Sequence, residues 1–406
     1  MLKDTWPLEL IEDPQRQPRI VETAEEFVRE LLVGDHLEDF LVLPNGTDLL
    51  DLSWDDSMPE DLREALRGCG SAHDFALRLR QRPELCEKYR ADIEYVDGMR
   101  QQRDVLRKDK HNLGKRIDEA LRMSEVGLAD KSQLYIAEMR MKKEAPHPIG
   151  GEKVKTVCQR DVKDVLGPYA AWTLYWDRYD EGFFAGSRPS GKGVHVDQVL
   201  WSNVARNWHG CKLVAAWPKG EVSKRVALDF FDVLFSPPLK DRELAALRQA
   251  AKIAFIRPGD VYLFSGGIAH TVLCVSEEMC LGAYESIVTL HPSHVGHFLH
   301  TDDREGPYFL DKYAMCPRDL KDTKDDCLDQ LEDVEEQLAR GGPAAAPAPA
   351  PEAARPAPGR WAALLARLHA DGALQAALRR HYGQAVDLCA GDRYFRKHMA
   401  RRVLEA

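Results

Sequence analysis

One segment constrains the fold of this chain more than any other. It runs from Ser190 to Asp197 and reads Ser-Gly-Lys-Gly-Val-His-Val-Asp. On a β-strand, side chains two residues apart lie on the same face, so His195 and Asp197 would project together into one interior. One imidazole and one carboxylate on a common face, completed by a third ligand from elsewhere, form the facial triad that binds non-haem Fe(II) and leaves coordination positions open. The segment therefore predicts a strand that carries two metal ligands.

The third ligand is expected at His270. This residue follows a Pro-Gly-Asp turn at 258–260, an apolar stretch that ends at Phe264, and a glycine-containing loop. A His-x-acid triplet alone is weak evidence, because a chain with 14 His and 66 acidic residues should contain such triplets by chance. His36-Leu37-Glu38 is one of these. The alternative for His195 is a half-buried histidine in a barrel strand, but the flanking glycines, the β-rich surroundings and the second strand before His270 favour a metal site.

The run from Phe183 to Pro218 resembles the JmjC family of Fe(II)/2-oxoglutarate oxygenases. Within that family it is most similar to the bifunctional arginine demethylase and lysyl-hydroxylase group. The shared pattern is Ser-Gly-x-Gly-x-His-x-Asp, then a helix, then Gly-x-Lys and a strand that ends in proline. The Pro-Gly-Asp turn, Val272-Leu273 and the segment Leu174-Tyr175-Trp176-Asp177 extend the match. The resemblance covers the region from Trp172 to about His300.

The resemblance implies a role for each matching residue. His195, Asp197 and His270 would be the iron ligands. Lys212 would be the cation for the distal carboxylate of 2-oxoglutarate, helped by the Tyr175 hydroxyl. The chemistry of a lysine agrees, because a buried ammonium needs an anionic partner, and a dicarboxylate supplies one. The structural alternative for Lys212 is a strand-edge lysine in water. The implied activity is hydroxylation or demethylation of a substrate, expected to be a protein.

Four positions depart from the family pattern. Lys192 stands where the group has Thr, Ala205 and Cys274 stand where it has Asn, and Gly282 falls near a usual Thr. Each change removes a neutral hydrogen-bonding group or adds a charge near the co-substrate pocket. Lys192 is either a second contact for the anion or a solvated loop lysine. The metal triad is therefore better supported than the 2-oxoglutarate site.

Two alternative functions follow from these departures. One is a non-catalytic JmjC-like protein used for binding or scaffolding, in which the co-substrate pocket has degenerated. The other is a metal-binding cupin without an oxoacid co-substrate, and the presence of Lys212 and Tyr175 argues against it.

Composition sets limits on the class of protein. The 406 residues suffice for two or three domains, and 44% hydrophobic with 30% charged residues is ordinary for a soluble protein. We expect no secretion signal and no membrane anchor, since no apolar run is long enough to span a bilayer. Nine cysteines without a Cys-x-x-Cys pair fit reduced thiols in the cytoplasm or nucleus. A net charge of -10 disfavours broad binding to nucleic acid.

The first part of the chain, 1–165, is expected to be mainly helical. Apolar spacing predicts a helix over 20–32, with Thr23 as its cap and Gly34 beyond its end. Further helices are predicted from Ser57 to Gly68 and from Ser71, where Asp74 completes a capping box. One long amphipathic helix, or two joined near Gly98, is predicted between Leu85 and Leu121. Basic residues between 100 and 116 are interpreted as a solvated helix face, or alternatively as a contact for an acidic partner or a phosphate backbone.

The core, 166–315, is expected to be a JmjC-like jelly-roll within an α+β protein. Several short strands with glycine turns and interspersed helices suggest a double-stranded β-helix, as in cupins. Strands are predicted at 171–176, 182–185, 193–197, 212–217, 253–257, 260–264, 271–275 and 280–289. Helices are predicted at 199–208 and 241–251, while 226–235 fits either state.

The remainder divides into four segments. Four histidines at intervals of three, His291 to His300, are expected on the surface of a helical segment, because such a row drifts around the helix axis. An acidic helix is expected at 316–340 and a Pro/Ala-rich linker at 341–359. A basic helical module at 360–406 would dock on the acidic helix or bind an acidic partner, with nucleic acid a weak possibility. We expect the residues after Gly341 to be removable without unfolding the core.

Overall fold

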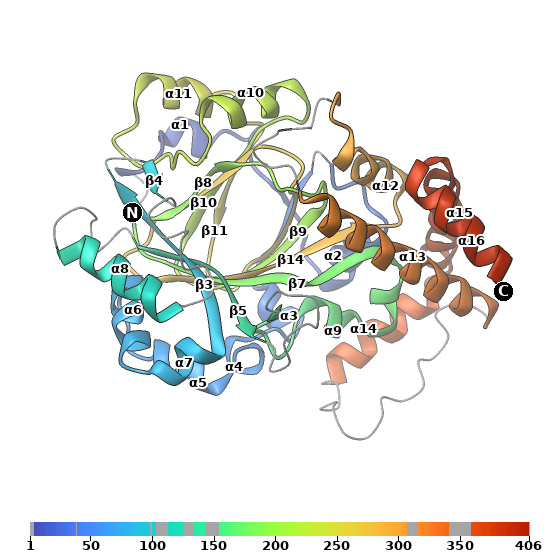
Figure 1. Ribbon diagram of the computed structural model, residues 1–406, viewed down its shortest axis with the longest axis horizontal. Helices are drawn as coiled ribbons and strands as arrows, with labels where there is room; N and C mark the ends of the chain where they lie inside the picture. The colour runs from blue at the N-terminus through green and yellow to red at the C-terminus, as the bar shows by residue number, and fades with distance from the viewer. Residues whose placement is uncertain are drawn as a thin grey trace.

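The computed structural model of the chain describes residues 4–37, 39–97, 100–102, 113–125, 134–142, 154–306, 310, 315–340 and 359–405. It is a mixed α+β structure with two sheets that face each other (Figure 1). Their strands pair in antiparallel fashion except for β1 and β2. The α+β class predicted from the sequence is confirmed, and the arrangement is consistent with a jelly-roll core.

The larger sheet has the strand order β1-β2-β12-β9-β14-β7-β5-β3-β4, with β6 beside β5, and the smaller sheet has the order β11-β10-β13-β8. The strands are β1 Arg19–Ile20, β2 Phe40–Leu43, β3 Tyr89–Asp97, β4 Arg100–Gln102, β5 Tyr135–Lys142, β6 Val154–Lys155, β7 Thr173–Gly186, β8 Gly191–His195, β9 Ser202–His209, β10 Lys212–Ala216, β11 Lys252–Ile256, β12 Val261–Ser265, β13 His270–Cys274 and β14 Cys280–Thr289. From β7 to β14 the chain changes sheet at each step except between β10 and β11.

The helices are α1 Leu8–Ile11, α2 Ala24–Val33, α3 Gly46–Leu49, α4 Trp54–Ser57, α5 Glu60–Leu66, α6 Ala72–Arg80, α7 Pro83–Lys88, α8 Leu113–Glu125, α9 Val162–Leu166, α10 Glu221–Asp229, α11 Asp241–Leu247, α12 Pro292–Leu299, α13 Pro317–Ala339, α14 Gly359–Ala370, α15 Gly372–Gly391 and α16 Arg393–Glu405. The predicted caps of α2 and α6 are confirmed. The Thr23 side chain accepts a hydrogen bond from the Glu26 N–H, and Ser71 does the same for Asp74.

Two predicted helices are wrong. The segment 199–208, predicted as a helix, contains β9, which lies between β12 and β14 in the middle of the larger sheet. Side chains on both faces of β9 are buried, so its apolar residues lack the alternation that distinguishes a strand from a helix. Of the helix or pair of helices predicted between Leu85 and Leu121, the first part contains β3 instead, where Tyr89, Ala91 and Ile93 are buried at the spacing of a strand. The second part is helical in α8. Tyr89 and Ile93 also satisfy helical spacing, which explains the error.

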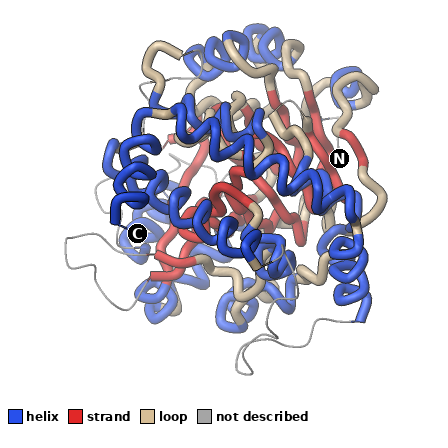
Figure 2. The backbone as a smooth tube through the Cα atoms, turned by 90° about the vertical axis from the view of Figure 1, so that its right-hand side faces the viewer, coloured by secondary structure: helices blue, strands red, loops and turns tan. Residues whose placement is uncertain are grey.

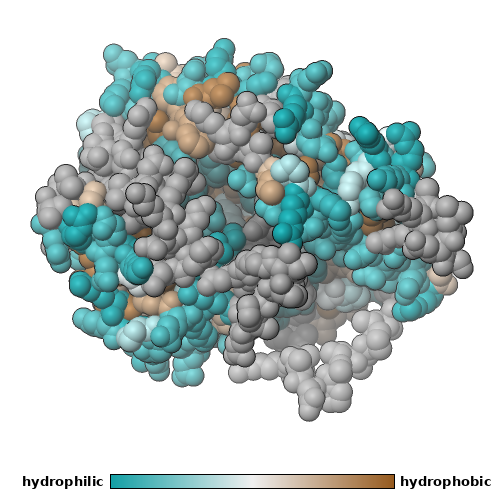
Figure 3. All heavy atoms as spheres, viewed as in Figure 1, coloured by the Kyte–Doolittle hydropathy of each residue, from teal (hydrophilic) through white to brown (hydrophobic). Residues whose placement is uncertain are grey.

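Helices cover the outer faces of both sheets. Trp6 and helices α10 and α11 pack against the smaller sheet around Trp217. Helices α2, α12 and α13 share a core with β7, β9, β12 and β14 of the larger sheet. Figure 2 shows this helical layer in front of the strands. On the face seen in Figure 3 the described residues are mostly hydrophilic, and hydrophobic ones gather near α10 and α11.

The C-terminal helices belong to the same core as the larger sheet. Leu368, Leu378 and Phe395 are fully buried in the cluster that also contains strand residues. Tyr394 donates a hydrogen bond to Asp325 on the acidic helix α13. Docking on the acidic helix was one of the two alternatives left open by the sequence. The expected linker, except for its last residue, lies outside the described residues.

The histidine row is less exposed than predicted. His294 and His297 are buried, so their expected surface position is wrong. The Thr289 N–H donates a hydrogen bond to His294 Nδ1, and Ser202 contacts the other ring nitrogen. His36 lies with its ring centroid 5.2 Å from that of His294. Burial lowers the pKa of His36 to about 4 and that of His297 to about 4. These rings are therefore neutral parts of the fold at neutral pH.

A first prediction concerns the C-terminal helices. Because Leu378 is fully buried in the shared core, Leu378→Ala should lower the free energy of unfolding of the whole protein by about 2–5 kcal/mol. The control Leu388→Ala, at a partly exposed position on the same helix, should stay within about 0.5 kcal/mol of the wild type. A chain ending at Arg340 should likewise melt at a lower temperature. If the truncated and full chains are equally stable in chemical denaturation, the C-terminal helices are a separate module and not part of the core.

A second prediction concerns pH. The pKa of His36 is about 4 in the fold and about 6.5 when unfolded, so the unfolded chain binds the proton first as the pH falls. The stability associated with neutral His36 is complete above pH 6.5 and decreases as the pH falls toward 4. When the pH is lowered from 7.5 to 4.5, the free energy of unfolding should fall in both proteins. The fall should be about 2–3 kcal/mol smaller for His36→Gln than for the wild type. The exposed control His300→Gln should follow the wild type. Identical pH profiles for all three proteins contradict this account.

Candidate metal centre and co-substrate pocket

The structure brings the three predicted ligands together at the contact between β8 and β13. His195 ends β8, His270 begins β13, and the two are paired across the ladder. One possible ligand atom from each of His195, Asp197 and His270 lies within 4.8 Å of the other two. Among the described residues, no other group of three or more His, Cys, Asp or Glu side chains meets this condition. The geometry is that of a three-residue metal site.

Each histidine is oriented by a backbone carbonyl two residues before it. His195 Nδ1 lies 2.8 Å from the Gly193 oxygen, and His270 Nδ1 lies 2.9 Å from the Ile268 oxygen. Because a carbonyl oxygen only accepts, Nδ1 must carry the proton in both rings. Nε2 is then the unprotonated nitrogen that can bind a metal. Both imidazoles are thus fixed in the tautomer that a metal ligand needs.

Asp197 is held by a residue that the sequence did not single out. Asn203 on β9 donates a hydrogen bond of 2.8 Å to Asp197 Oδ2, while Oδ1 lies 3.7 Å from His195 Nε2. Burial raises the pKa of Asp197, and the nearby His270 acts in the opposite direction. One carboxylate oxygen is therefore anchored and the other faces the histidines. The sequence did not indicate that Asn203 contacts Asp197, because the segment 199–208 was predicted as a helix.

The loop before His270 must approach the site closely. A Cβ atom on Gly266 would lie 1.9 Å from Asp197 Oδ2, and one on Gly267 would lie 2.1 Å from His297 Nε2. The Asp197 N–H donates to the Gly266 carbonyl oxygen at 3.0 Å. A side chain at position 266 would displace the Asp197 carboxylate, and one at position 267 would displace the buried His297 ring.

Lys212 begins β10 and is 1% exposed. Within the described part of the chain, its Nζ makes no hydrogen bond. Nζ lies 5.7 Å from the centroid of the Tyr284 ring. A Cβ on Gly282 would lie 2.8 Å from Nζ, so the glycine at this position leaves room for the ammonium. The expectation of a buried lysine fits this position, and the solvated strand-edge alternative does not.

The other two predicted co-substrate residues have different surroundings. Tyr175 on β7 stacks on Trp201, with ring centroids 6.3 Å apart, in the core of the larger sheet. Lys192 is 8% exposed, and its Nζ forms an ion pair of 2.8 Å with Glu94 on β3. The solvated alternative for Lys192 is therefore wrong. Its charge is balanced by a carboxylate of the chain itself, unlike that of Lys212.

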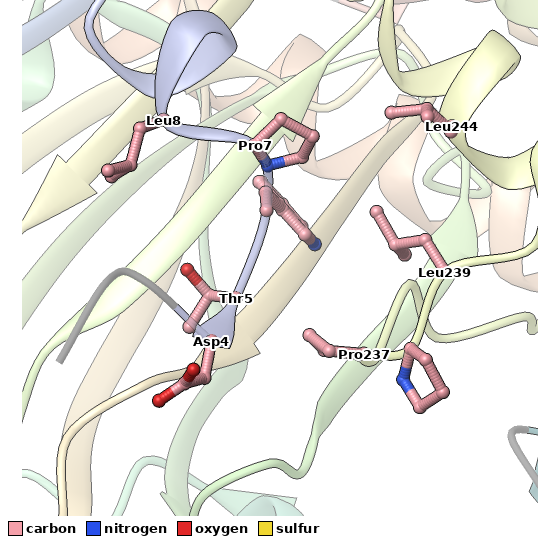
Figure 4. Close-up of a pocket in the computed structure, with 9 residues that line it drawn as sticks. Asp4, Thr5, Pro7, Leu8, Pro237, Leu239 and Leu244 are labelled. Carbon is pink, nitrogen blue, oxygen red and sulfur yellow. The ribbon is translucent and has the colours of Figure 1, made fainter.

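The cavities on the described surface include two of different size. One of about 440 Å³, shown in Figure 4, is bounded by residues 4–8 and by the segment from Pro237 to Leu244, and none of the triad residues lines it. The other, of about 230 Å³, is lined by Phe264, Ile268 and Ala216 among others. The Phe264 ring packs edge-on against His270, with centroids 5.0 Å apart. The smaller cavity thus shares a wall with the metal centre.

Comparisons with known proteins give little support for a family assignment. No protein-family model matches the chain, and no curated protein matches it. Among solved structures, it is similar to two of YcfD, a ribosomal oxygenase from Escherichia coli, the second in complex with cobalt and succinic acid. Both alignments show 12% identity and cover 91% of this chain, with 71% and 72% of the other chain and TM-scores of 0.32 and 0.33. Values this low establish no function for this chain.

A third prediction concerns Asn203. Removing its amide leaves the buried Asp197 oxygen without a donor and frees the carboxylate to turn away from the histidines. Asn203→Ala should therefore weaken binding of a divalent metal about 10- to 100-fold. Titration with Mn(II), followed by the water-relaxation signal, measures this affinity. An unchanged affinity in a variant with native circular dichroism would show that Asn203 does not position the ligand.

Proposed function

We propose that this chain is an Fe(II)- and 2-oxoglutarate-dependent oxygenase built on a jelly-roll formed by β7 to β14. His195, Asp197 and His270 would hold the iron, and Lys212 would bind the distal carboxylate of 2-oxoglutarate. The observation that carries the proposal is the buried, unpaired ammonium of Lys212 in the same barrel as a three-residue metal site. Neither feature alone indicates this chemistry, but together they fit a metal with an anionic co-substrate.

The donor set suits iron. Two neutral imidazoles and one carboxylate are the ligands of non-haem Fe(II) oxygenases, and three protein ligands leave positions open for other molecules. Zinc also accepts such ligands, so the triad by itself leaves a metal-binding cupin as an alternative. Lys212 distinguishes the two, because a cupin without an oxoacid has no use for a buried cation that lacks a partner.

An anion at Lys212 would also stabilise the fold. A buried charge without a partner is destabilising, and a bound carboxylate would remove that cost. 2-Oxoglutarate has one carboxylate for Lys212 and an oxoacid group for the metal at its other end. When iron, 2-oxoglutarate and O₂ are bound, they supply oxidative decarboxylation to succinate and CO₂ coupled to oxidation of a substrate C–H bond. The chain supplies the ligand orientation and the closed interior.

The substrate proposed here is a protein side chain, which is hydroxylated or, at an N-methyl group, demethylated. All nine cysteines are free thiols, which supports a reducing compartment such as the cytoplasm or nucleus. The alternative is a non-catalytic JmjC-like scaffold. Ala205 and Cys274 still favour it, because they replace polar residues of the family pattern with side chains that line an apolar interior.

A fourth prediction tests the proposed function. His195→Ala, Asp197→Ala and His270→Ala should each lose bound iron, measured by elemental analysis, while keeping the thermal unfolding transition. Lys212→Ala should retain iron but lose the succinate that the wild type releases from 2-oxoglutarate. Lys252→Ala, which removes a lysine from the β11 strand next to β10, is the control and should retain both. Wild-type protein that binds iron but neither binds nor decarboxylates 2-oxoglutarate would establish the scaffold alternative.

A further inference from the structure

A pair of tyrosine hydroxyls, one on a buried and one on a partly buried residue, lies near Lys212. Tyr262 on β12 is fully buried, and its hydroxyl oxygen lies 2.6 Å from that of Tyr284 on β14. The rings meet at right angles with centroids 6.0 Å apart, against the apolar interior around Val214 and Phe264. Burial raises the pKa of Tyr262 well above its usual value, so this phenol carries its proton. The pair is a fixed polar feature in an otherwise apolar cluster.

The tyrosine pair has one O–H group that the contact between the two hydroxyls does not use. Each hydroxyl has one O–H, and the contact between the two uses one of these protons. Among the described residues, neither hydroxyl makes another hydrogen bond. One O–H is therefore left to donate. Because Tyr284 is only partly buried, this O–H is open to water or to a bound molecule.

The spare donor and the unpaired ammonium lie beside each other, with Lys212 Nζ 5.7 Å from the centroid of the Tyr284 ring. Gly282 and Tyr284 are two residues apart on β14, so they face the same side of the sheet. Gly282 leaves the space that Lys212 Nζ occupies, and the Tyr284 ring lies beside that Nζ. The acceptor to be considered in the chain is Asn207 Oδ1, which is buried without a partner and lies 3.5 Å from where a Gly282 Cβ would be. Its two lone pairs accept at most two hydrogen bonds, whereas the ammonium and the phenol offer four donors.

A pocket with more donors than acceptors suits a carboxylate, which accepts through both oxygens and donates nothing when ionised. We propose that the Tyr262–Tyr284 pair, through the Tyr284 hydroxyl, donates the second hydrogen bond to the distal carboxylate held by Lys212. This assignment rests on the proposed function. It gives Tyr284 the part that the resemblance implies for Tyr175, whose ring stacks on Trp201. It also shows how the pocket compensates for the polar groups missing at Ala205, Cys274 and Gly282.

The test compares two ligands that differ only at the distal end. 2-Oxoglutarate has the distal carboxylate, and 2-oxobutyrate has the same oxoacid group without it. Isothermal titration of each into Mn(II)-loaded full-length protein gives a ratio of affinities. Tyr284→Phe should lower the preference for 2-oxoglutarate about 10- to 100-fold, the range for one hydrogen bond to a charged group. Its affinity for 2-oxobutyrate should stay unchanged. Lys212→Ala should lower the preference at least as much.

Three controls separate the possible outcomes. Tyr175→Phe should leave the ratio within about twofold of the wild type. Tyr262→Phe should lower it less than Tyr284→Phe, because the Tyr284 O–H remains, and it serves as the second variant if Tyr284→Phe folds poorly. An unchanged ratio in both Tyr284→Phe and Tyr262→Phe, or a loss confined to Tyr175→Phe, overturns this assignment but leaves the proposed function intact. If the Mn(II)-loaded wild type binds neither ligand, the proposed function itself fails.

Discussion

The pairing of β8 with β13 is the interaction on which the site depends. It places His195 opposite His270, and the chain that continues from β8 carries Asp197 to the same point. His270 is buried there, whereas the side chains of His195 and Asp197 are 16% and 18% exposed. The carbonyls of Gly193 and Ile268 then fix both rings. Backbone hydrogen bonds therefore fix the positions of these candidate ligands.

The two buried lysines of this interior differ in whether a carboxylate of the chain balances their charge. Lys192 is neutralised by Glu94, so it contributes to the fold at the edge of the barrel. Lys212 has no such partner, and the Tyr262–Tyr284 pair adds a donor beside it. A buried ammonium in such an interior is destabilising until an anion binds beside it. This imbalance, rather than the triad, separates an oxoacid-dependent enzyme from a metal-binding cupin.

The sequence could predict the parts of the site that rest on local pattern. His195 and Asp197 share a strand face whatever the rest of the chain does, and the turn before His270 marks the start of another strand. Asn203 and Tyr284 could not be found in this way, because their roles arise from contacts across the sheets. β9 was mistaken for a helix because burial on both faces removes the alternation of a half-exposed strand. Lys192 was misjudged since its partner Glu94 lies on a strand that itself had been predicted as a helix.

The central claim is that metal and anion bind to one site. Calorimetric titration of 2-oxoglutarate into the wild-type protein, with and without a redox-silent divalent metal such as Mn(II), tests it most directly. The account predicts saturable binding with one equivalent when the metal is present, and much weaker binding without it, since the oxoacid group then has no ligand and only Lys212 holds the molecule. Absence of binding in the presence of metal, or equal affinity with and without it, would contradict the account.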